Sequence, residues 1–441
     1  MRGPGPFELA MRRVAVIGSG ISGLSVAHAL AGQARVTLFE AGGHFGGHTN
    51  TVDMTLDGVT HGVDTGFLVL NERTYPQLLK LFGELGVEIA KSEMSFSVQV
   101  PGPGQARGLE WSGCDLNTVF AQRANLLRPR FWRMLSDLMR FNKLATTLAA
   151  SGEVDTLDQP IGDFLAQHRF SAEFRDWYFL PMIGCIWSCP VDQMLRFPVA
   201  TMLRFCHNHG LLQVANRPQW YTVRGGARTY VLKMLQAVPD ARLNTPVRSV
   251  RRVDGSVLLA TDVGTEHFDE VVLACHSDQS LALLADASAA ETRVLGAIRY
   301  QRNRAVLHTD VSVLPQRRKA WAAWNYERTA TGSSEEASVC LHYLLNRLQP
   351  LPFTSPVVVS LNPVTDPRAD TIHAEFDYAH PVFDMAAIAA QQRVPSLQGD
   401  RHTWFAGAWT RYGFHEDGLM SGLAVARGLR AAWSMPMKEA A

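Results

Sequence analysis

One stretch near the start of the chain restricts the possible folds more than any other. Residues 12–41 read RRVAVIGSGISGLSVAHALAGQARVTLFEA. The apolar run at 14–17 predicts a buried parallel strand, and it is followed by Gly18, Gly20 and Gly23 in the spacing G-x-G-x-x-G. The first glycine permits a tight turn, the second lets the backbone approach a pyrophosphate, and the third lets a helix pack on the strand. The stretch therefore predicts the strand, turn, helix and strand of a Rossmann-type unit.

The end of the second expected strand indicates what this turn binds. Glu40 stands where an acidic side chain can accept hydrogen bonds from the ribose hydroxyls of an adenosine. The amides at the start of the helix face the phosphates, and the helix dipole favours negative charge there. The motif alone is weak, but strand, helix and acid together favour a dinucleotide site over a glycine turn without a ligand. The expected site also includes Ser19, Ile21, Ser22 and Ala41.

Length and charge bound the class of protein. A chain of 441 residues is longer than one hydrophobic core usually supports, so two domains are expected. The net charge of +1 gives no strong field that would attract nucleic acid. The N-terminal residues lack the apolar segment of a secretory signal, and the six cysteines contain no C-x-x-C pair. We expect a cytoplasmic protein that can contact the inner face of the membrane.

Several further segments resemble the flavin-containing amine oxidase and phytoene desaturase-like superfamily. After Glu40 the chain continues AGGHFGGHTN, in which Gly46 and Gly47 match the family's second glycine pair. The resemblance implies that this pair supports the pyrophosphate and ribityl chain of FAD. The family usually has arginine after the pair, where this chain has His48. No second G-x-G-x-x-G is present, which argues against a separate NAD(P)H domain.

The resemblance continues in the middle of the chain. GVDTGFLVL at 62–70 is similar to the family's D-x-G segment, which implies that Thr65, Gly66 and Phe67 lie beside the flavin. YTVRGGARTYVLKML is similar to its Gly-Gly turn before a helix. LNTPVRSV and FDEVVLAC are similar to the strands that close the FAD domain, and by this analogy the backbone of Val247 meets the adenine.

The stretch GAWTRYGFHEDGLMSG at 407–422 resembles the superfamily's last motif. A strand at 403–406 is expected to stop at Gly407, and a helix to restart around Gly418 and Leu419. In the family the start of this helix faces N1 and the C2 carbonyl of the flavin, where its dipole stabilises the anionic reduced form. These three residues join the expected cofactor-binding set.

The aromatic residues of the same stretch are candidates for the substrate side of the flavin: Trp409, Tyr412 and Phe414. His415 is the one general base that the motif offers. The alternative is that His415 hydrogen-bonds a main-chain carbonyl and shapes the loop. A dedicated base is not obligatory, because hydride departure to flavin N5 can carry most of such a reaction.

These assignments predict an α/β fold with a Rossmann-type FAD-binding domain and an interleaved α+β substrate domain. The FAD-binding domain takes residues 11–75, 210–290 and 396–435, and the substrate domain takes 76–209 and 291–395. The first insertion is expected to be mostly helical and the second to form antiparallel strands. The spaced histidines His44 and His48 and the HNH run at 207–209 lack further ligands, so no metal site is expected.

One helix of the first insertion has two interpretations. Residues 128–143 combine arginines with Phe131, Trp132 and several other large apolar side chains, and Pro129 is expected to begin a helix. Basic charge with aromatic residues is typical of a helix at a membrane surface. The alternative is an ordinary amphipathic helix, with arginines in solvent and aromatic rings in the core.

The likeness is closest to a bacterial branch of FAD-dependent oxidoreductases, through DTGFLVLNERTYP, NLLRPRFWRML, RPQWYTVRGG and GFHEDGL. Members of this branch are often linked to methyltransferases of the cyclopropane synthase type, which implies a lipid acyl substrate and such a partner. The main hypothesis is therefore an FAD-dependent, desaturase-like enzyme that moves hydride from a C–H bond of a fatty-acyl or phospholipid chain to flavin N5. A flavin amine oxidase is the first alternative. A flavin-binding, non-catalytic partner of a lipid-modifying enzyme is the second.

Overall fold

The computed structural model describes residues 11–101, 108–188, 191–213, 217–328 and 339–434. The chain forms two compact units, each discontinuous in sequence. The first takes the chain up to Thr49, Arg228–Ile298 and the chain from Ala389; the second takes Asn50–Ala227 and Arg299–Ile388. Residues 50–75 and 210–227, which the sequence assigns to the FAD-binding domain, thus pack with the second unit.

A parallel sheet forms the centre of the first unit, in the order β10-β2-β1-β14-β20. Its strands are β1 (Arg13–Ile17), β2 (Arg35–Phe39), β10 (Asp240–Arg242), β14 (Glu270–Leu273) and β20 (Thr403–Phe405). The apolar run at 14–17 is buried in β1, as a strand covered on both faces requires. From β1 the chain continues to β2 on one side, and the later strand β14 pairs with β1 on the other side. The strand order therefore reverses next to β1, and doubly wound folds bind their ligands at such a point. The α/β prediction is confirmed.

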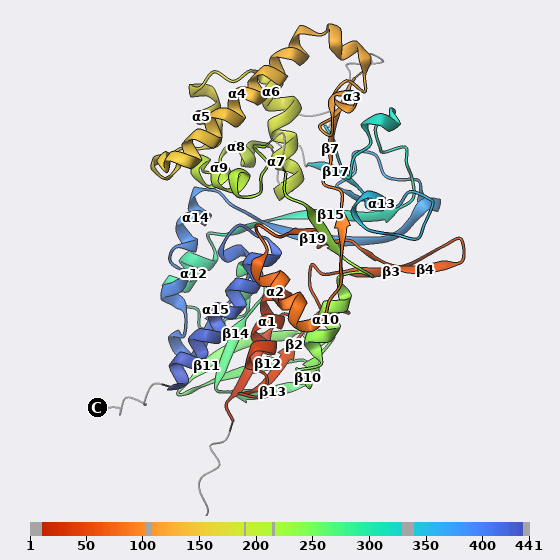
Figure 1. The fold of residues 1–441 in the computed structure, drawn as a ribbon. Coiled ribbons are helices and arrows are strands. Elements are labelled where there is room, and N and C mark those ends of the chain that lie inside the picture. The colour runs from red at the N-terminus through yellow and green to blue at the C-terminus, as the bar shows by residue number, and fades with distance from the viewer. Residues whose placement is uncertain (1–10, 102–107, 189–190, 214–216, 329–338, 435–441) are drawn as a thin grey trace, which may run out of the picture. The chain divides into compact units, whose positions relative to one another are not determined.

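Two helices pack closely on each other in this unit, α1 (Ile21–Leu30) and α15 (His415–Ser434) (Figure 1). A Cβ added to Gly418 would lie 2.7 Å from Cγ2 of Ile21, and one added to Gly422 would lie 2.0 Å from Oγ of Ser25. Only glycine permits such close approach. Since both residue numbers rise together along the contact, the helices are parallel and their N-termini lie at the same end.

The start of α15 differs from the prediction. The helix begins at His415, three residues before Gly418. The N–H of Gly418 donates to the carbonyl of Phe414 at 3.0 Å, which closes a helical turn ahead of the glycine. The N–H of Phe414 in turn donates to Oδ2 of Asp417 at 3.1 Å. The side chain of Asp417 therefore caps a turn that the glycine pattern alone does not reveal.

Smaller elements complete the first unit. An antiparallel sheet contains β11 (Val247–Val253), β12 (Ser256–Thr261) and β13 (Gly264–Phe268). The remaining helices include α10 (Arg228–Leu235), α11 (Ser277–Leu283) and α12 (Ala289–Leu295). Arg252 on β11 and Glu291 on α12 form a buried two-pronged ion pair, with both N–O distances at 3.0 Å.

A seven-stranded sheet forms the centre of the second unit, in the order β19-β15-β18-β17-β16-β7-β8. Its strands are β7 (Phe96–Val100), β8 (Leu109–Ser112), β15 (Arg299–His308), β16 (Trp324–Glu327), β17 (Cys340–Leu344), β18 (Val358–Leu361) and β19 (Ile372–Val382). The strands of the second insertion pair antiparallel, as predicted. Strands β7 and β8 come from the first insertion, and β7 joins β16 in parallel.

Two small sheets flank this centre. One pairs β3 (Thr51–Leu56) with β4 (Val59–Asp64), and the other contains β5 (Leu70–Asn71), β9 (Trp220–Val223) and β6 (Ile89–Ser92). Helix α2 (Pro76–Leu85) ends at Gly86, which has a left-handed conformation that glycine adopts without strain.

The rest of the first insertion is largely helical (Figure 1). Its helices are α3 (Leu116–Val119), α4 (Pro129–Ser151), α5 (Ile161–Gln167), α6 (Ala172–Phe174), α7 (Leu180–Trp187), α8 (Val191–Leu195) and α9 (Val199–Asn208). Pro129 is the first residue of α4, as predicted. Two short helices follow later in the chain, α13 (Leu345–Leu348) and α14 (Met385–Gln391). Within the described residues, no helix is both long and apolar enough to cross a bilayer.

Candidate functional site

The first glycine turn lies at the carboxyl end of β1. Gly18 has a φ of +101°, and its N–H donates to the carbonyl of Phe39 at the end of β2 at 2.8 Å. A Cβ on Gly23 would lie 1.9 Å from the carbonyl oxygen of Gly18, so only glycine lets α1 follow the turn so closely. These two glycines are required by the fold itself.

Gly20 differs from the other two glycines. Its φ of −61° is ordinary for any residue, and no atom of the described residues lies within 4 Å of the position that a Cβ would take. The protein therefore has no internal need for glycine here. The open space next to the N-terminus of α1 is what a pyrophosphate would fill, so this position fits a dinucleotide.

The second glycine pair lies against the first turn. The N–H of Gly46 contacts both the carbonyl oxygen and Oγ of Ser19, each at 3.1 Å. A Cβ on Gly47 would lie 3.1 Å from Cα of Gly20. Both glycines of the pair have positive φ, +119° and +58°. The two loops that the sequence assigns to the FAD phosphates are thus neighbours, while His48 follows them partly buried.

Glu40 connects the two loops to the expected adenosine side. Its Oε2 accepts hydrogen bonds from N and Oγ of Ser19 at 3.0 and 2.5 Å, and its Oε1 accepts one from the N–H of Gly42 at 2.8 Å. Its backbone carbonyl accepts from the N–H of Thr245 at 2.8 Å. Val247 begins β11 two residues later. The structure brings the ribose acid and the expected adenine segment together, and the contact of Val247 with adenine stays a prediction.

Trp409 occupies a different place from the one expected. Its side chain is 2% exposed, and its Nε1 donates to the carbonyl of Cys275 at 3.1 Å. A Cβ on Gly407 would lie 2.1 Å from this nitrogen, so Gly407 makes room for the indole. An indole N–H inside a protein needs such an acceptor. This placement leaves Trp409 almost no surface with which to line a substrate pocket, whereas Tyr412 and Phe414 keep partly exposed rings.

His415 is buried at the first position of α15. Its Nε2 lies 2.6 Å from the hydroxyl of Tyr230 and 3.2 Å from Oγ1 of Thr49, and these two oxygens lie 2.5 Å apart. Burial lowers the pKa of His415 to about 3, so the ring is neutral near pH 7. These contacts with two side-chain hydroxyls support a positioning role for the ring. Sequence reasoning missed Tyr230 and Thr49: both stand inside segments quoted for the flavin, YTVRGGARTYVLKML and AGGHFGGHTN, but nothing in these patterns marks the two hydroxyls as partners of His415.

The N-terminus of α15 carries two buried acids, Glu416 and Asp417. Burial raises the pKa of Asp417 to about 6, against the opposing effect of the hydrogen bond from the N–H of Phe414. Leu419 is buried in the same turn. The close approach that Gly418 permits is to α1, and contact of Gly418 or Leu419 with flavin remains a prediction.

The D-x-G segment lies in the second unit, where Asp64 is a buried hub. Its carboxylate accepts hydrogen bonds from Oγ1 of Thr51 at 2.5 Å, from the N–H of Ala227 at 2.9 Å and from Nε2 of Gln349 at 2.6 Å. Asp64 therefore fixes the Gly-Gly turn that ends at Ala227 against the hairpin of β3 and β4. The charge is satisfied by three donors, as a buried carboxylate requires.

The residues after Asp64 have their own anchor. Oγ1 of Thr65 lies 2.7 Å from the hydroxyl of Tyr378 on β19 and donates to the carbonyl of Asn50 at 3.0 Å. Gly66 and Phe67 follow partly exposed. Tyr378 is a third residue that sequence reasoning missed, since an alternating strand gives no sign of which hydroxyl meets a distant loop.

The glycine turn, the open position at Gly20 and the acid at Glu40 define a Rossmann-type dinucleotide site. The family model described as flavin containing amine oxidoreductase matches residues 21–331. The chain belongs to this family, and it is an FAD-dependent oxidoreductase. The residues that would hold FAD in the first unit are the two glycine loops and Glu40. When bound, the flavin supplies the hydride-accepting chemistry.

Solved structures show the same fold over nearly the whole chain. One is a CLA-producing fatty acid isomerase from P. acnes, with 15% identity, a TM-score of 0.66 and coverage of 96% of this chain and 99% of that one. Another is wild-type putrescine oxidase bound to putrescine, with 16% identity, a TM-score of 0.67 and coverage of 95% and 99%. A third is cyclohexylamine oxidase from Brevibacterium oxydans, with 17% identity, a TM-score of 0.63 and coverage of 96% and 100%. A comparison with curated protein sequences gave no match.

Proposed function

We propose that this oxidoreductase acts on a fatty-acyl or phospholipid chain in a desaturase-like reaction. One C–H bond breaks and its electron pair moves as hydride to FAD, a proton leaves the neighbouring carbon for solvent, and a carbon–carbon double bond forms. The observation that carries the proposal is an exposed apolar and basic surface around the start of α4, which we call the α4 surface. An enzyme with a lipid substrate needs such a surface to reach it.

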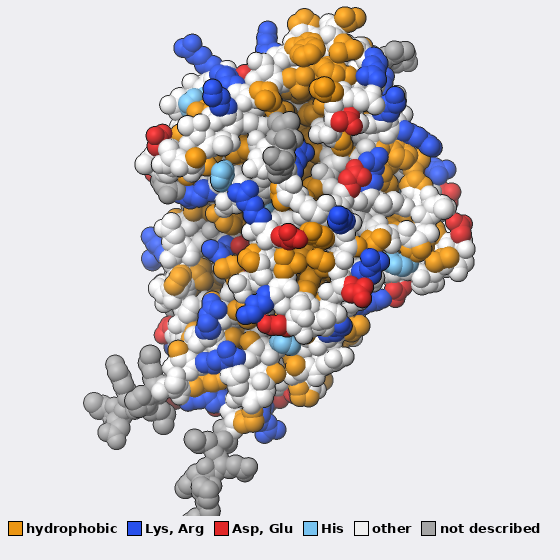
Figure 2. Space-filling view, viewed as in Figure 1, with side chains coloured by type: hydrophobic (Ala, Val, Ile, Leu, Met, Phe, Trp, Pro, Cys, Tyr) orange, Lys and Arg blue, Asp and Glu red, His pale blue; other side chains and the backbone are white. Residues whose placement is uncertain are grey.

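The α4 surface is formed by large apolar side chains that no other part of the described chain covers. Leu127 is 87% exposed, Leu116 is 79% exposed and Trp132 is 49% exposed. Leu126 and Met139 are also exposed. Figure 2 shows hydrophobic side chains gathered over the region of α3 and α4, with Lys and Arg side chains beside them. Several such residues together are unusual for a surface that meets only water.

Basic residues stand near these apolar side chains in the sequence: Arg123, Arg128, Lys143 and Arg133, of which Arg133 lies 3.9 Å from Glu173. The nearby acids already have partners. Asp137 lies 2.8 Å from Arg140, and Glu173 lies 2.6 Å from Arg130. The positive charge that remains suits an anionic bilayer, to which each basic residue contributes about 1 kcal/mol near the surface.

Each of the two interpretations of residues 128–143 finds support in a different part of α4. Phe131, Met134 and Phe141 are buried, and the ring of Phe141 lies 5.1 Å from that of Phe179 between centroids. This face is the core face of an ordinary amphipathic helix. Trp132 and Met139 face away from it, and they support a peripheral contact with the inner membrane face.

An anaerobic absorption experiment tests the reaction. The FAD-loaded protein is mixed with vesicles of phosphatidylglycerol or phosphatidylcholine that carry defined acyl chains. We expect bleaching of the oxidised flavin band with at least one acyl lipid, and a lipid product that has lost two hydrogens by mass spectrometry. Absence of bleaching with every lipid, in protein whose flavin dithionite still reduces, contradicts the proposal.

The family description and the likeness to amine oxidases support a second candidate, oxidation of a primary or secondary amine. It predicts bleaching by amines such as putrescine or cyclohexylamine and release of peroxide in air. A flavin that no lipid or amine reduces, in protein that co-purifies with a methyltransferase of the cyclopropane synthase type, would instead support the non-catalytic alternative.

A further inference from the structure

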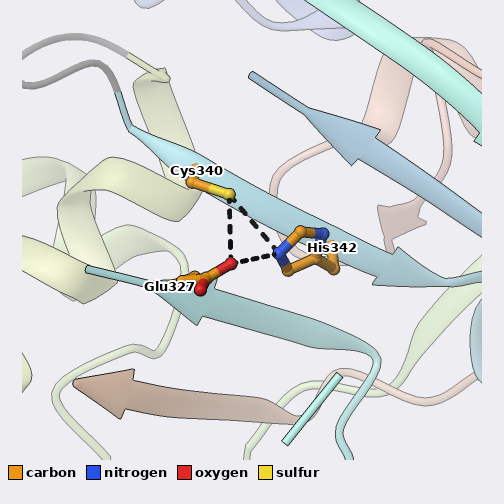
Figure 3. A group of neighbouring side chains, drawn as sticks. All are labelled: Glu327, Cys340 and His342. Atoms are coloured by element: carbon orange, nitrogen blue, oxygen red, sulfur yellow. Dashed lines mark hydrogen bonds and ion pairs between the residues drawn. The ribbon is translucent and has the colours of Figure 1, made fainter. Parts of the chain in front are cut away.

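We infer that Glu327, Cys340 and His342 form a binding site for a divalent, zinc-type metal ion in the seven-stranded sheet (Figure 3). The site lies in the second unit and does not depend on the proposed lipid reaction. The sequence predicts no metal here, because the glutamate and the C-x-H pair are separated by a long hairpin connection. Strand pairing brings them together.

The strand register explains why the three side chains converge. Glu327 on β16 lies directly opposite Cys340 on β17. His342 follows two residues later on β17, so its side chain leaves the same face of the sheet as Cys340. Figure 3 shows all three side chains pointing into one space. The site is therefore built by the pairing of two adjacent strands.

The distances between the ligand atoms lie within about 0.3 Å of those around a tetrahedral ion. Oε2 of Glu327 lies 3.0 Å from Nε2 of His342, Sγ of Cys340 lies 3.4 Å from the same nitrogen, and Sγ lies 3.8 Å from Oε2. Zinc bonds of about 2.0–2.3 Å at tetrahedral angles place such atoms about 3.3–3.6 Å apart. Small shifts of the side chains would bring all three atoms into the coordination of one ion, with a fourth position for water.

The histidine geometry also favours a shared central ion over hydrogen bonds alone. Both Sγ of Cys340 and Oε2 of Glu327 approach the same ring nitrogen, Nε2 of His342. A neutral ring carries at most one hydrogen there, which serves Glu327, and the thiol of Cys340 then donates to the same carboxylate over a long contact of 3.8 Å. A thiolate, a carboxylate and a neutral imidazole around a divalent cation have a net charge of zero, which suits a buried place.

A second layer of contacts holds the imidazole. Nδ1 of His342 lies 2.6 Å from Oγ of Ser360, which lies 2.7 Å from Nε2 of His308. The N–H of Asp310 donates to Nδ1 of His308 at 3.1 Å, so the hydrogen of His308 is on Nε2 and is donated to Ser360. The oxygen of Ser360 can also accept the Nδ1 hydrogen of His342, which leaves Nε2 free to bind metal.

Binding requires a defined proton change. Cys340 loses its thiol proton to solvent, and the ring hydrogen of His342 moves from Nε2 to Nδ1, so no oxidant or reductant is needed. Without metal, burial raises the pKa of the Cys340 thiol well above its usual value, which keeps it unreactive. A cysteine protease-like role is disfavoured, because Glu327 contacts the nitrogen that faces the thiol and not the opposite one.

One of the three ligands is partly exposed. Cys340 and His342 are fully buried, while the side chain of Glu327 is 23% exposed. The carboxylate can therefore meet a hydrated cation first and carry it to the two buried ligands. This order matches the preference of a hard oxygen ligand for a hydrated ion and of a thiolate for zinc.

Metal analysis of the full-length, FAD-loaded protein tests the site. We expect one zinc per chain after dialysis against buffered zinc, and a cobalt–thiolate charge-transfer absorption after replacement by Co²⁺. Cys340→Ser should abolish the charge-transfer band and lower zinc affinity at least tenfold. Cys114→Ser is the matched control, because Cys114 is an exposed cysteine outside the cluster and its loss should change neither readout.

Glu327→Gln keeps the size of the side chain and provides a second variant if Cys340→Ser does not fold. It should retain the cobalt–thiolate band at reduced affinity, and zinc should raise its thermal midpoint less than that of the unchanged protein. The site is overturned if the unchanged protein binds zinc substoichiometrically, or if the cobalt–thiolate band persists in folded Cys340→Ser protein.

Discussion

The hydroxyl of Tyr230 on α10 lies 2.6 Å from Nε2 of His415 at the first position of α15. This bond connects the helix after the Gly-Gly turn to the helix whose start faces the N-terminus of α1. Thr49 joins the pair from the second glycine loop, with its Oγ1 2.5 Å from the tyrosine hydroxyl. Three segments that the family resemblance assigns to the flavin are thus held by one buried polar cluster.

Tyr230→Phe tests the contribution of this cluster. The substitution keeps the buried ring and removes the hydroxyl, which leaves His415 with Thr49 at 3.2 Å. We expect a loss of about 1–2 kcal/mol in the free energy of unfolding, since one buried polar partner disappears. Denaturant unfolding of the FAD-free protein measures it. An unchanged midpoint would show that the cluster contributes nothing to stability.

Gly20→Ala separates a requirement of the fold from a requirement of the ligand. The backbone at Gly20 is ordinary and a Cβ meets no atom of the described chain, so the FAD-free protein should unfold within about 0.5 kcal/mol of the original. FAD affinity should fall at least tenfold, because the methyl group takes space next to the pyrophosphate.

Fluorescence titration of FAD-free Gly20→Ala protein measures this affinity. Gly83→Ala on α2 is the control, because it also meets open space among the described residues and has no expected role in FAD binding. Equal FAD affinity in the two variants would mean that the pyrophosphate does not lie next to Gly20.

The sequence predicts most of the fold where signals are local. The run from β1 to β2 and the start of α4 at Pro129 follow from strand hydrophobicity, glycine spacing and proline position. The cluster of Tyr230, His415 and Thr49 could not be predicted, because its members come from three distant segments and only tertiary packing joins them. The same holds for Glu327 and His342, whose proximity depends on strand register. Local sequence patterns predict backbone geometry. Contacts between side chains that are distant in the sequence can be identified only once the folded structure is known.

Asp417→Asn should change the pH dependence of stability. The pKa of Asp417 is raised to about 6 by burial, above the value of about 3.9 expected in the unfolded chain. Its contribution to stability is therefore present below pH 4 and is lost as the pH rises from 4 to 6. A shift of about 2 units corresponds to about 3 kcal/mol at most. Asparagine can still accept from the N–H of Phe414 and has no such loss.

Unfolding free energies of both proteins at several pH values between 4 and 7 measure the effect. The free energy of unfolding of the variant, minus that of the original protein, should rise by about 1–3 kcal/mol between pH 4 and pH 7. The low pKa of His415 also makes stability depend on pH, but it does so equally in both proteins, so this effect cancels in the difference between their unfolding free energies. A constant difference across this range would mean that Asp417 is ionised as usual.

Glu291→Gln should weaken the first unit. Glu291 accepts from Arg252 at 3.0 Å by both oxygens and also from Arg401 at 3.0 Å, and Arg252 and Glu291 are both buried. Removing the charge leaves buried Arg252 with Asp286, at 2.8 Å, as an ionic partner and also weakens the pair with Arg401, so we expect a cost of about 3 kcal/mol, the low end for breaking a buried pair. Glu88→Gln breaks the exposed pair with Arg224 and should cost less than about 1 kcal/mol. Similar unfolding free energies for the two variants would contradict the burial argument.

Leu127→Glu tests the α4 surface without touching the expected flavin loops. Leu127 is 87% exposed, so the folded protein should tolerate the change. If the side chain inserts into a bilayer, its loss costs about 1.5–3 kcal/mol, and a negative charge near anionic lipid adds to this. Binding to phosphatidylglycerol vesicles in a co-sedimentation assay should therefore fall more than tenfold. Val263→Glu is the matched control, since Val263 is 89% exposed and belongs to the first unit, between β12 and β13. Equal vesicle binding by the two variants would exclude the α4 surface as the membrane contact. The same substitution outside the α4 surface would then have the same effect on binding as the substitution within it.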